Sequence, residues 1–129
     1  FLIPGLVDSH VHFEHTPNDA LLYLANGVTQ VRDMAGSSFH MELAKATADG
    51  QLGPDMFVAC QKVYNKGGFA GILSNWTHNR INISSEEQAK QLVKRLANDG
   101  FDAVKISHGL RSEIYWALEN EAKQQGIPL

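Results

Sequence analysis

The sequence predicts an α/β fold made of parallel β/α repeats, and three observations support this prediction. Short apolar stretches rich in β-branched residues alternate along the chain with longer stretches of helical periodicity. A glycine follows each helical stretch, at the position where a left-handed residue ends a helix: Gly27, Gly50, Gly100 and Gly126. Strands that alternate with helices pair in parallel through right-handed crossovers.

The first half of the chain gives two strand–helix units. Residues 2–12 are predicted to form a strand that is broken near its start by Pro4 and Gly5, and residues 18–26 a helix. We expect the apolar residues 21–24 of this helix to pack in the core. Residues 28–34 are short and β-branched, which favours a second strand. A serine, Ser37 or Ser38, then caps a helix that runs to Asp49.

The second half continues the alternation. Its expected elements are a third strand at 55–63, a helix ending at 98–99, a fourth strand at 101–107, a helix at 112–125 and a fifth strand opening at 127. Ser84 and Glu87 have the spacing of a capping box for the first of these helices. Residues 64–83 form one long irregular stretch, rich in Gly and Asn.

Two architectures fit this order: a doubly wound open sheet, or about half of a TIM-type (β/α)₈ barrel, since a complete barrel needs roughly 250 residues. No Gly-x-Gly-x-x-Gly motif follows the first strand, which argues against a dinucleotide-binding sheet. We treat residues 1–129 as one partial barrel domain of four βα units, truncated at the fifth strand. The chain lacks an initial Met and ends in "GIPL", so we expect it to be a piece of a longer protein.

Composition gives little sign of a macromolecular partner. The chain is 43% hydrophobic and 19% charged, with a net charge of −3, so we expect neither nucleic acid nor a membrane surface to bind it. No apolar run approaches the roughly 20 residues of a membrane span, and a cytoplasmic location is favoured. Cys60 is the single cysteine, which excludes an internal disulfide and favours a small core residue.

The stretch "GLVDSHVHFEH" holds three of the six histidines. Side chains alternate along a strand, so His10 and His12 should point to the same side, about 7 Å apart at Cα. They lie at the carboxyl end of the strand, where active sites of parallel sheets are built, and two imidazoles there could bind one divalent ion. The spacing also fits the polar face of a half-exposed strand, and both interpretations stay open on the spacing alone.

Three motifs together resemble the metal-dependent amidohydrolase superfamily, in its prolidase-like and imidazolonepropionase-like branches. "LIPGLVDSHVHFEH" is similar to that family's "PGLIDxHxH" first strand, "GVTQVRDMAG" to its "GVTTVRDMGG" second strand, and "GFDAVKIS" to its "GADxIKI" fourth strand. The resemblance spans nearly the whole chain. It implies the N-terminal half of a TIM barrel in which His10 and His12 are metal ligands.

Lys105 lies in the middle of the predicted fourth strand. A lysine is rarely buried without a partner, and desolvation favours its neutral amine, which can react with carbon dioxide to give a carbamate. In the resembling family a carbamylated lysine at this place bridges two metals, so Lys105 is the third candidate ligand, expected to meet His10 and His12 at one rim of the sheet. The alternative is a lysine paired with a neighbouring carboxylate.

The resemblance implies a hydrolase that cleaves C–N bonds of small amides or dipeptides with water activated by two Zn²⁺ ions. Its remaining ligands, two histidines and an aspartate that is also the general base, would lie beyond Leu129, and Asp8 is a poor substitute for that base, so we expect these residues alone to be inactive. Alternatives are a mononuclear deaminase or cyclic amidohydrolase, and a non-catalytic structural or interaction module. A half barrel exposes strand edges, so self-association is expected.

Other polar residues have weaker assignments. No catalytic residue is assigned within this chain, but His78 and His108 are possible pocket residues, in the loops that follow the third and fourth strands. Arg32 and Asp33 are expected to form an internal ion pair or to support a loop. We expect His40 to lie on the surface of its helix, and His15 near the ligand pair.

Overall fold

The computed structural model describes residues 1–14, 16, 18–65 and 80–129. They form two compact units, Phe1–Ala59 and Cys60–Leu129. Within the described residues, no helix combines the length and the apolar character needed to cross a membrane.

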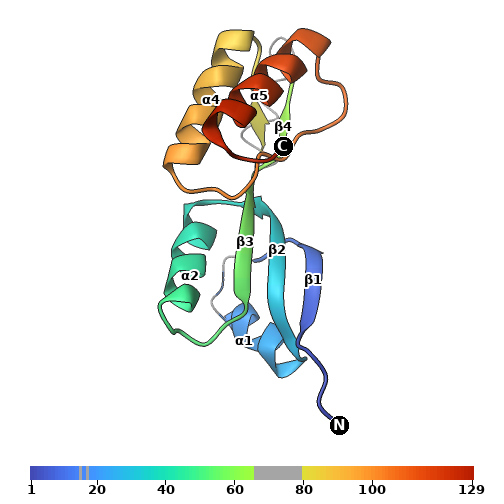
Figure 1. Ribbon diagram of the computed structural model, residues 1–129, viewed down its shortest axis with the longest axis vertical. Coiled ribbons are helices and arrows are strands. Elements are labelled where there is room, and N and C mark those ends of the chain that lie inside the picture. The colour runs from blue at the N-terminus through green and yellow to red at the C-terminus, as the bar shows by residue number, and fades with distance from the viewer. Residues whose placement is uncertain (15, 17, 66–79) are drawn as a thin grey trace. The chain divides into compact units, whose positions relative to one another are not determined.

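The first unit is a three-stranded sheet with two helices (Figure 1). Its elements are β1 (Leu6–Val11), α1 (Asn18–Ala25), β2 (Val28–Gly36), α2 (Ser38–Ala48) and β3 (Asp55–Cys60). The strands lie in the sequential order β1-β2-β3, and β1 pairs with β2 in parallel. In Figure 1 all three arrows point the same way, as predicted for strands joined through helices.

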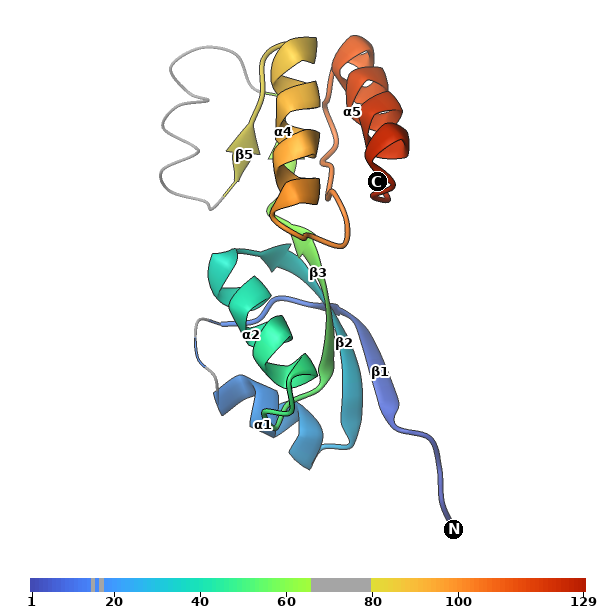
Figure 2. The same cartoon turned by 60° about the vertical axis from the view of Figure 1, so that its left-hand side comes forward.

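Both helices pack on one face of this sheet. A single apolar cluster joins Val11 and Val31 of the strands to Ala20 of α1 and Leu43 of α2, and Figure 2 shows the two helices in front of the strands. A doubly wound sheet carries helices on both faces and reverses its strand order. Sequential strands with helices on one face are the arrangement of a barrel wall, so the open alternative is excluded for this part of the chain.

The second unit contains β4 (Val63–Tyr64), β5 (Ile81–Asn82), α4 (Glu86–Asn98) and α5 (Ser112–Gln125). The two helices lie side by side (Figure 2) and bury the apolar side chains of Val93, Leu96, Ile114 and Leu118. Both helices end where a glycine takes a positive φ, 85° at Gly100 and 70° at Gly126, as the sequence predicts.

The predicted fourth strand is an extended segment without continuous strand geometry. It still makes parallel hydrogen bonds, since Val63 N donates to Lys105 O at 2.8 Å and Ser107 N donates to Val63 O at 2.8 Å. On its other side Val104 N donates to Pro128 O at 2.9 Å, which begins the pairing expected of a fifth strand. The predicted third strand is likewise interrupted, at residues 61–62 between β3 and β4.

Two local predictions are wrong. The N-cap of α4 is Ser85, one residue later than expected, because its Oγ accepts from Gln88 N at 3.2 Å while the Gln88 side chain accepts from Ser84 N at 2.8 Å. The core packing expected for residues 21–24 fails at Leu21 and Leu22, which are 46% and 61% exposed, and holds at Tyr23, which packs against the apolar cluster. Ala20 is the only fully buried residue of α1, so the helix turns its smallest apolar side chain toward the sheet.

Candidate metal centre

His10 and His12 lie side by side at the carboxyl end of β1. Their ring centroids are 5.4 Å apart and the ring planes differ by 5°, so the two imidazoles are stacked. Both residues are exposed, whereas Val11 and Phe13 are buried. The alternation predicted from the sequence therefore holds, and two nitrogen donors stand together on one side of the strand.

Hydrogen bonds to the backbone fix the strand segment that carries these histidines. Arg32 Nε donates to Ser9 O at 2.8 Å. A side chain of β2 therefore holds the backbone of β1 at the residue before His10. Asp8 Oδ1 accepts from His10 N at 3.2 Å. Arg32 therefore supports β1, and the internal ion pair expected between Arg32 and Asp33 is not formed.

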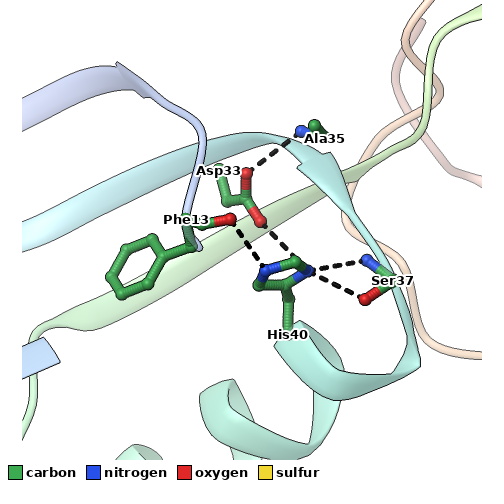
Figure 3. Close-up of polar contacts among 5 residues, drawn as sticks. All are labelled: Phe13, Asp33, Ala35, Ser37 and His40. Carbon is green, nitrogen blue, oxygen red and sulfur yellow. Dashed lines mark hydrogen bonds and ion pairs between the residues drawn. The ribbon is translucent and has the colours of Figure 1, made fainter. Parts of the chain in front are cut away.

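Asp33 lies beside the buried ring of His40, which corrects the expectation that His40 lies on the surface. The two side chains are 0% and 1% exposed, and His40 Nδ1 is 3.6 Å from Asp33 Oδ2 (Figure 3). Asp33 is buried because it shares the helix-facing side of β2 with Val31. His40 stands in the first turn of α2, three residues after the N-cap Ser37, and its buried ring contacts the rings of Phe13 and Phe39.

The sequence carried a signal for one contact of His40, its bond to the N-cap residue Ser37. Ser37 and His40 have the N-cap to N3 spacing of a capping box, with an imidazole where Glu or Gln is usual. In the structure Ser37 N donates to His40 Nδ1 at 2.9 Å. The surface prediction failed because the opposite edge of the ring meets the carbonyl oxygen of Phe13, which is 27 residues away in the sequence.

A pocket of about 430 Å³ opens beside His12. Its lining includes the carboxylates of Glu14 and Asp19 and the apolar side chains of Leu22 and Tyr23. Burial raises the pKa of the Tyr23 hydroxyl, and the negative charges of Asp8 and Asp19 raise it further. The pocket therefore has an apolar wall with acidic groups next to one of the candidate ligands.

Lys105 lies in the second unit and is partly buried. Its backbone N donates to Cys60 Sγ at 3.4 Å. Cys60 is fully buried, as predicted, and this burial raises the pKa of its thiol to about 11, against the opposing effect of the Lys105 backbone N–H. The role of Lys105 as a metal ligand, and its approach to the two histidines, stay predictions.

The remaining candidates are less well placed or lie outside the described residues. His108 is exposed in the turn after the fourth strand, with Nδ1 3.5 Å from Ser107 Oγ. His78 and His15 fall outside the described part of the chain, so their suggested pocket positions stay predictions.

The donor chemistry at β1 fits a divalent ion of the zinc type, because imidazole nitrogen is one of its usual ligands. Two ligands alone do not complete a site, since catalytic zinc takes three protein ligands. Across the residues that the structure describes, no group of three or more His, Cys, Asp or Glu side chains is arranged to hold a metal ion. The ligand role of His10 and His12 stays a prediction: the pair would supply two of the ligands that such a site needs.

Known structures share this fold. No protein-family model matches the chain, and the search of curated proteins gives no significant match. Among solved structures, bottromycin amidohydrolase matches with a TM-score of 0.79 and 25% identity, over 97% of this chain and 27% of its own. A Xaa-Pro dipeptidase with methionine bound in its active site matches with a TM-score of 0.75 and 22% identity, over 96% of this chain and 41% of its own.

Ochratoxinase from A. niger gives a TM-score of 0.70 at 19% identity, over 95% of this chain and 40% of its own. The chain thus spans between 27% and 41% of the length of these proteins. This partial coverage agrees with a partial barrel and confirms the resemblance found in the sequence motifs. In fold, the chain resembles a part of the barrel of these amidohydrolase and dipeptidase structures.

Proposed function

We propose that this chain is part of a metal-dependent hydrolase that cleaves C–N bonds of small amides or dipeptides. The observation that carries the proposal is the stacked pair of exposed imidazoles, His10 and His12, at the carboxyl end of β1. Parallel α/β barrels build their active sites at this end of their strands. The fold shared with an amidohydrolase and a dipeptidase supports the reaction class.

In this proposal the side chains of His10 and His12 hold a divalent ion, with zinc the expected metal. Such an ion, when bound, supplies Lewis-acid polarisation of the substrate carbonyl and lowers the pKa of a coordinated water. Arg32 and Asp8 keep the strand in place through their bonds to the backbone of Ser9 and His10. Lys105, as a carbamate, is proposed to be a ligand of both this ion and a second ion.

The substrate class is inferred from the related structures. One related structure is named as a Xaa-Pro dipeptidase, and another is named as an amidohydrolase. A dipeptide or an N-acyl amino acid is therefore the substrate that we propose.

Metal analysis together with activity tests the proposal. The purified full-length protein that contains this chain should hold divalent metal, lose hydrolysis of a dipeptide panel after chelation, and regain that hydrolysis when Zn²⁺ is restored. His10→Asn and His12→Asn should each lower the bound metal and abolish the restored activity. Full activity in protein freed of divalent ions would rule the proposal out.

The part played by Lys105 has a separate test. Lys105→Ala should halve the metal content if the site holds two ions bridged by the carbamate. Lys45→Ala is the matched control, because Lys45 is 81% exposed on α2 and pairs only with its neighbour Asp49 at 3.0 Å among the ion pairs of the described residues. Unchanged metal content and activity in Lys105→Ala would favour a single-metal site.

A further inference from the structure

His12 lies one residue beyond the end of β1, so the strand ladder does not include it. The next residue, Phe13, is buried, and its carbonyl oxygen is 3.3 Å from His40 Nε2 (Figure 3). A residue of α2 thus reaches the backbone immediately after a candidate metal ligand. The contact joins positions 27 residues apart in the sequence.

The hydrogen bonds around the His40 ring define which nitrogen carries the proton. Ser37 N donates to Nδ1 at 2.9 Å, and a backbone N–H can only donate, so Nδ1 must accept. Ser37 Oγ lies 3.0 Å from the same nitrogen and can donate to it as well. The ring proton is therefore on Nε2, which donates to Phe13 O.

Asp33 completes the environment of the ring from β2. Its Oδ1 accepts from Ala35 N at 3.0 Å, near the end of β2. Its Oδ2 faces the Nδ1 edge of the ring at 3.6 Å. Asp33 is also the register partner of Val11, the last residue of β1. The buried ring consequently links the ends of β1 and β2 to the first turn of α2.

We propose that His40 is a positioning residue for His12: through its bond to the Phe13 carbonyl, it fixes the backbone from which His12 reaches the metal. This rests on the proposed function insofar as His12 is a ligand. Residues that orient metal ligands from behind typically change metal affinity about 10- to 100-fold when they are replaced. A ring that served only as a helix cap or as core packing would not act on His12.

Two substitutions separate these roles. His40→Asn places an amide oxygen where Nδ1 stands, so it keeps the acceptor for Ser37 N but has no atom that reaches Phe13 O. His40→Gln places an amide nitrogen near the position of Nε2, so it can keep the donor to Phe13 O. If His40 positions His12, His40→Asn should loosen the backbone at His12 and weaken metal binding. His40→Gln should restore both.

The first readout needs no metal. Backbone ¹⁵N relaxation in the metal-free protein should show that the order parameters of His12, Phe13 and Glu14 fall from about 0.85 to about 0.6 in His40→Asn. They should stay at the wild-type value in His40→Gln. The second readout is titration with Co²⁺, followed by its visible absorption. We expect affinity to fall about tenfold in His40→Asn and to be restored in His40→Gln.

Each outcome decides one of the two proposals. Unchanged order parameters at residues 12–14 in His40→Asn, or equal loosening in both variants, would overturn the positioning role. If the order parameters of residues 12–14 fall in His40→Asn as predicted but the wild-type protein binds no Co²⁺, the restraint of the backbone by His40 stands and the proposed metal function is overturned. If a variant fails to fold, the ring tautomer of His40 in the unaltered protein is measured from long-range ¹H–¹⁵N spectra. A ring proton on Nδ1 instead of Nε2 would contradict the proposal, because Nε2 could not donate to Phe13 O.

Discussion

Replacing Asp33 by asparagine should leave the free energy of unfolding unchanged or slightly higher at neutral pH, although Asp33 is completely buried. The asparagine oxygen can accept from Ala35 N, as Asp33 Oδ1 does now at 3.0 Å. The other carboxylate oxygen, Oδ2, has no hydrogen-bond partner among the residues that the structure describes. The substitution thus keeps the bond that exists and removes an unpaired buried charge.

The magnitude follows from two opposing contributions. The bond to Ala35 N changes from charge-assisted to neutral, which costs about 1 kcal/mol. Removing an unpaired charged oxygen from the interior saves about 1–3 kcal/mol. The expected change therefore lies between zero and about 2 kcal/mol of added stability. If Asp33 and His40 instead formed a charged pair, loss of one partner would cost about 3–5 kcal/mol.

Denaturant unfolding at pH 7 measures this difference directly. Asp33→Ala is the control, because it removes the acceptor for Ala35 N and leaves a cavity, at a cost of about 2–3 kcal/mol. A loss of 3 kcal/mol or more in Asp33→Asn would refute the reasoning. It would mean that the ring of His40 is protonated at Nδ1, and the hydrogen bond from Ser37 N to that nitrogen would have to be abandoned.

Three further predictions concern the rest of the chain. Burial raises the Cys60 pKa from 9.0 to about 11, so the stability that the protonated thiol contributes is present below pH 9 and is lost as pH rises to about 11. Between pH 8 and pH 11, Cys60→Ala should lose about 2 kcal/mol less unfolding free energy than the wild type; equal losses contradict this. Leu118→Ala should cost about 2–5 kcal/mol in chemical unfolding because Leu118 is fully buried, whereas Leu22→Ala, at an exposed position, should cost under about 0.5 kcal/mol; similar costs for both would show that burial does not decide stability here. The chain by itself should self-associate through open strand edges, and light scattering from a clean monomer at high concentration would contradict that.

Features set by neighbours in the chain were predictable. The helix of residues 112–125 was predicted with the correct limits, because Gly126 follows it and a single glycine is enough to end a helix. In the structure Gly126 has a φ of 70°. The common side of His10 and His12 follows from the pleat of a single strand. The motif resemblance added the type of barrel, and the solved structures of an amidohydrolase and a dipeptidase share this fold.

Features set by packing between distant segments were not predictable. The sequence by itself determined the order of strands and helices and the two imidazoles at the end of β1. Only the tertiary structure decided that both helices cover one face of the sheet, and that His40 turns inward to meet Asp33 and Phe13. The rotation of a helix about its axis is set by which side chains bury the most apolar surface against the sheet and satisfy the most buried polar groups. That balance depends on residues far apart in the chain, which a local pattern does not contain.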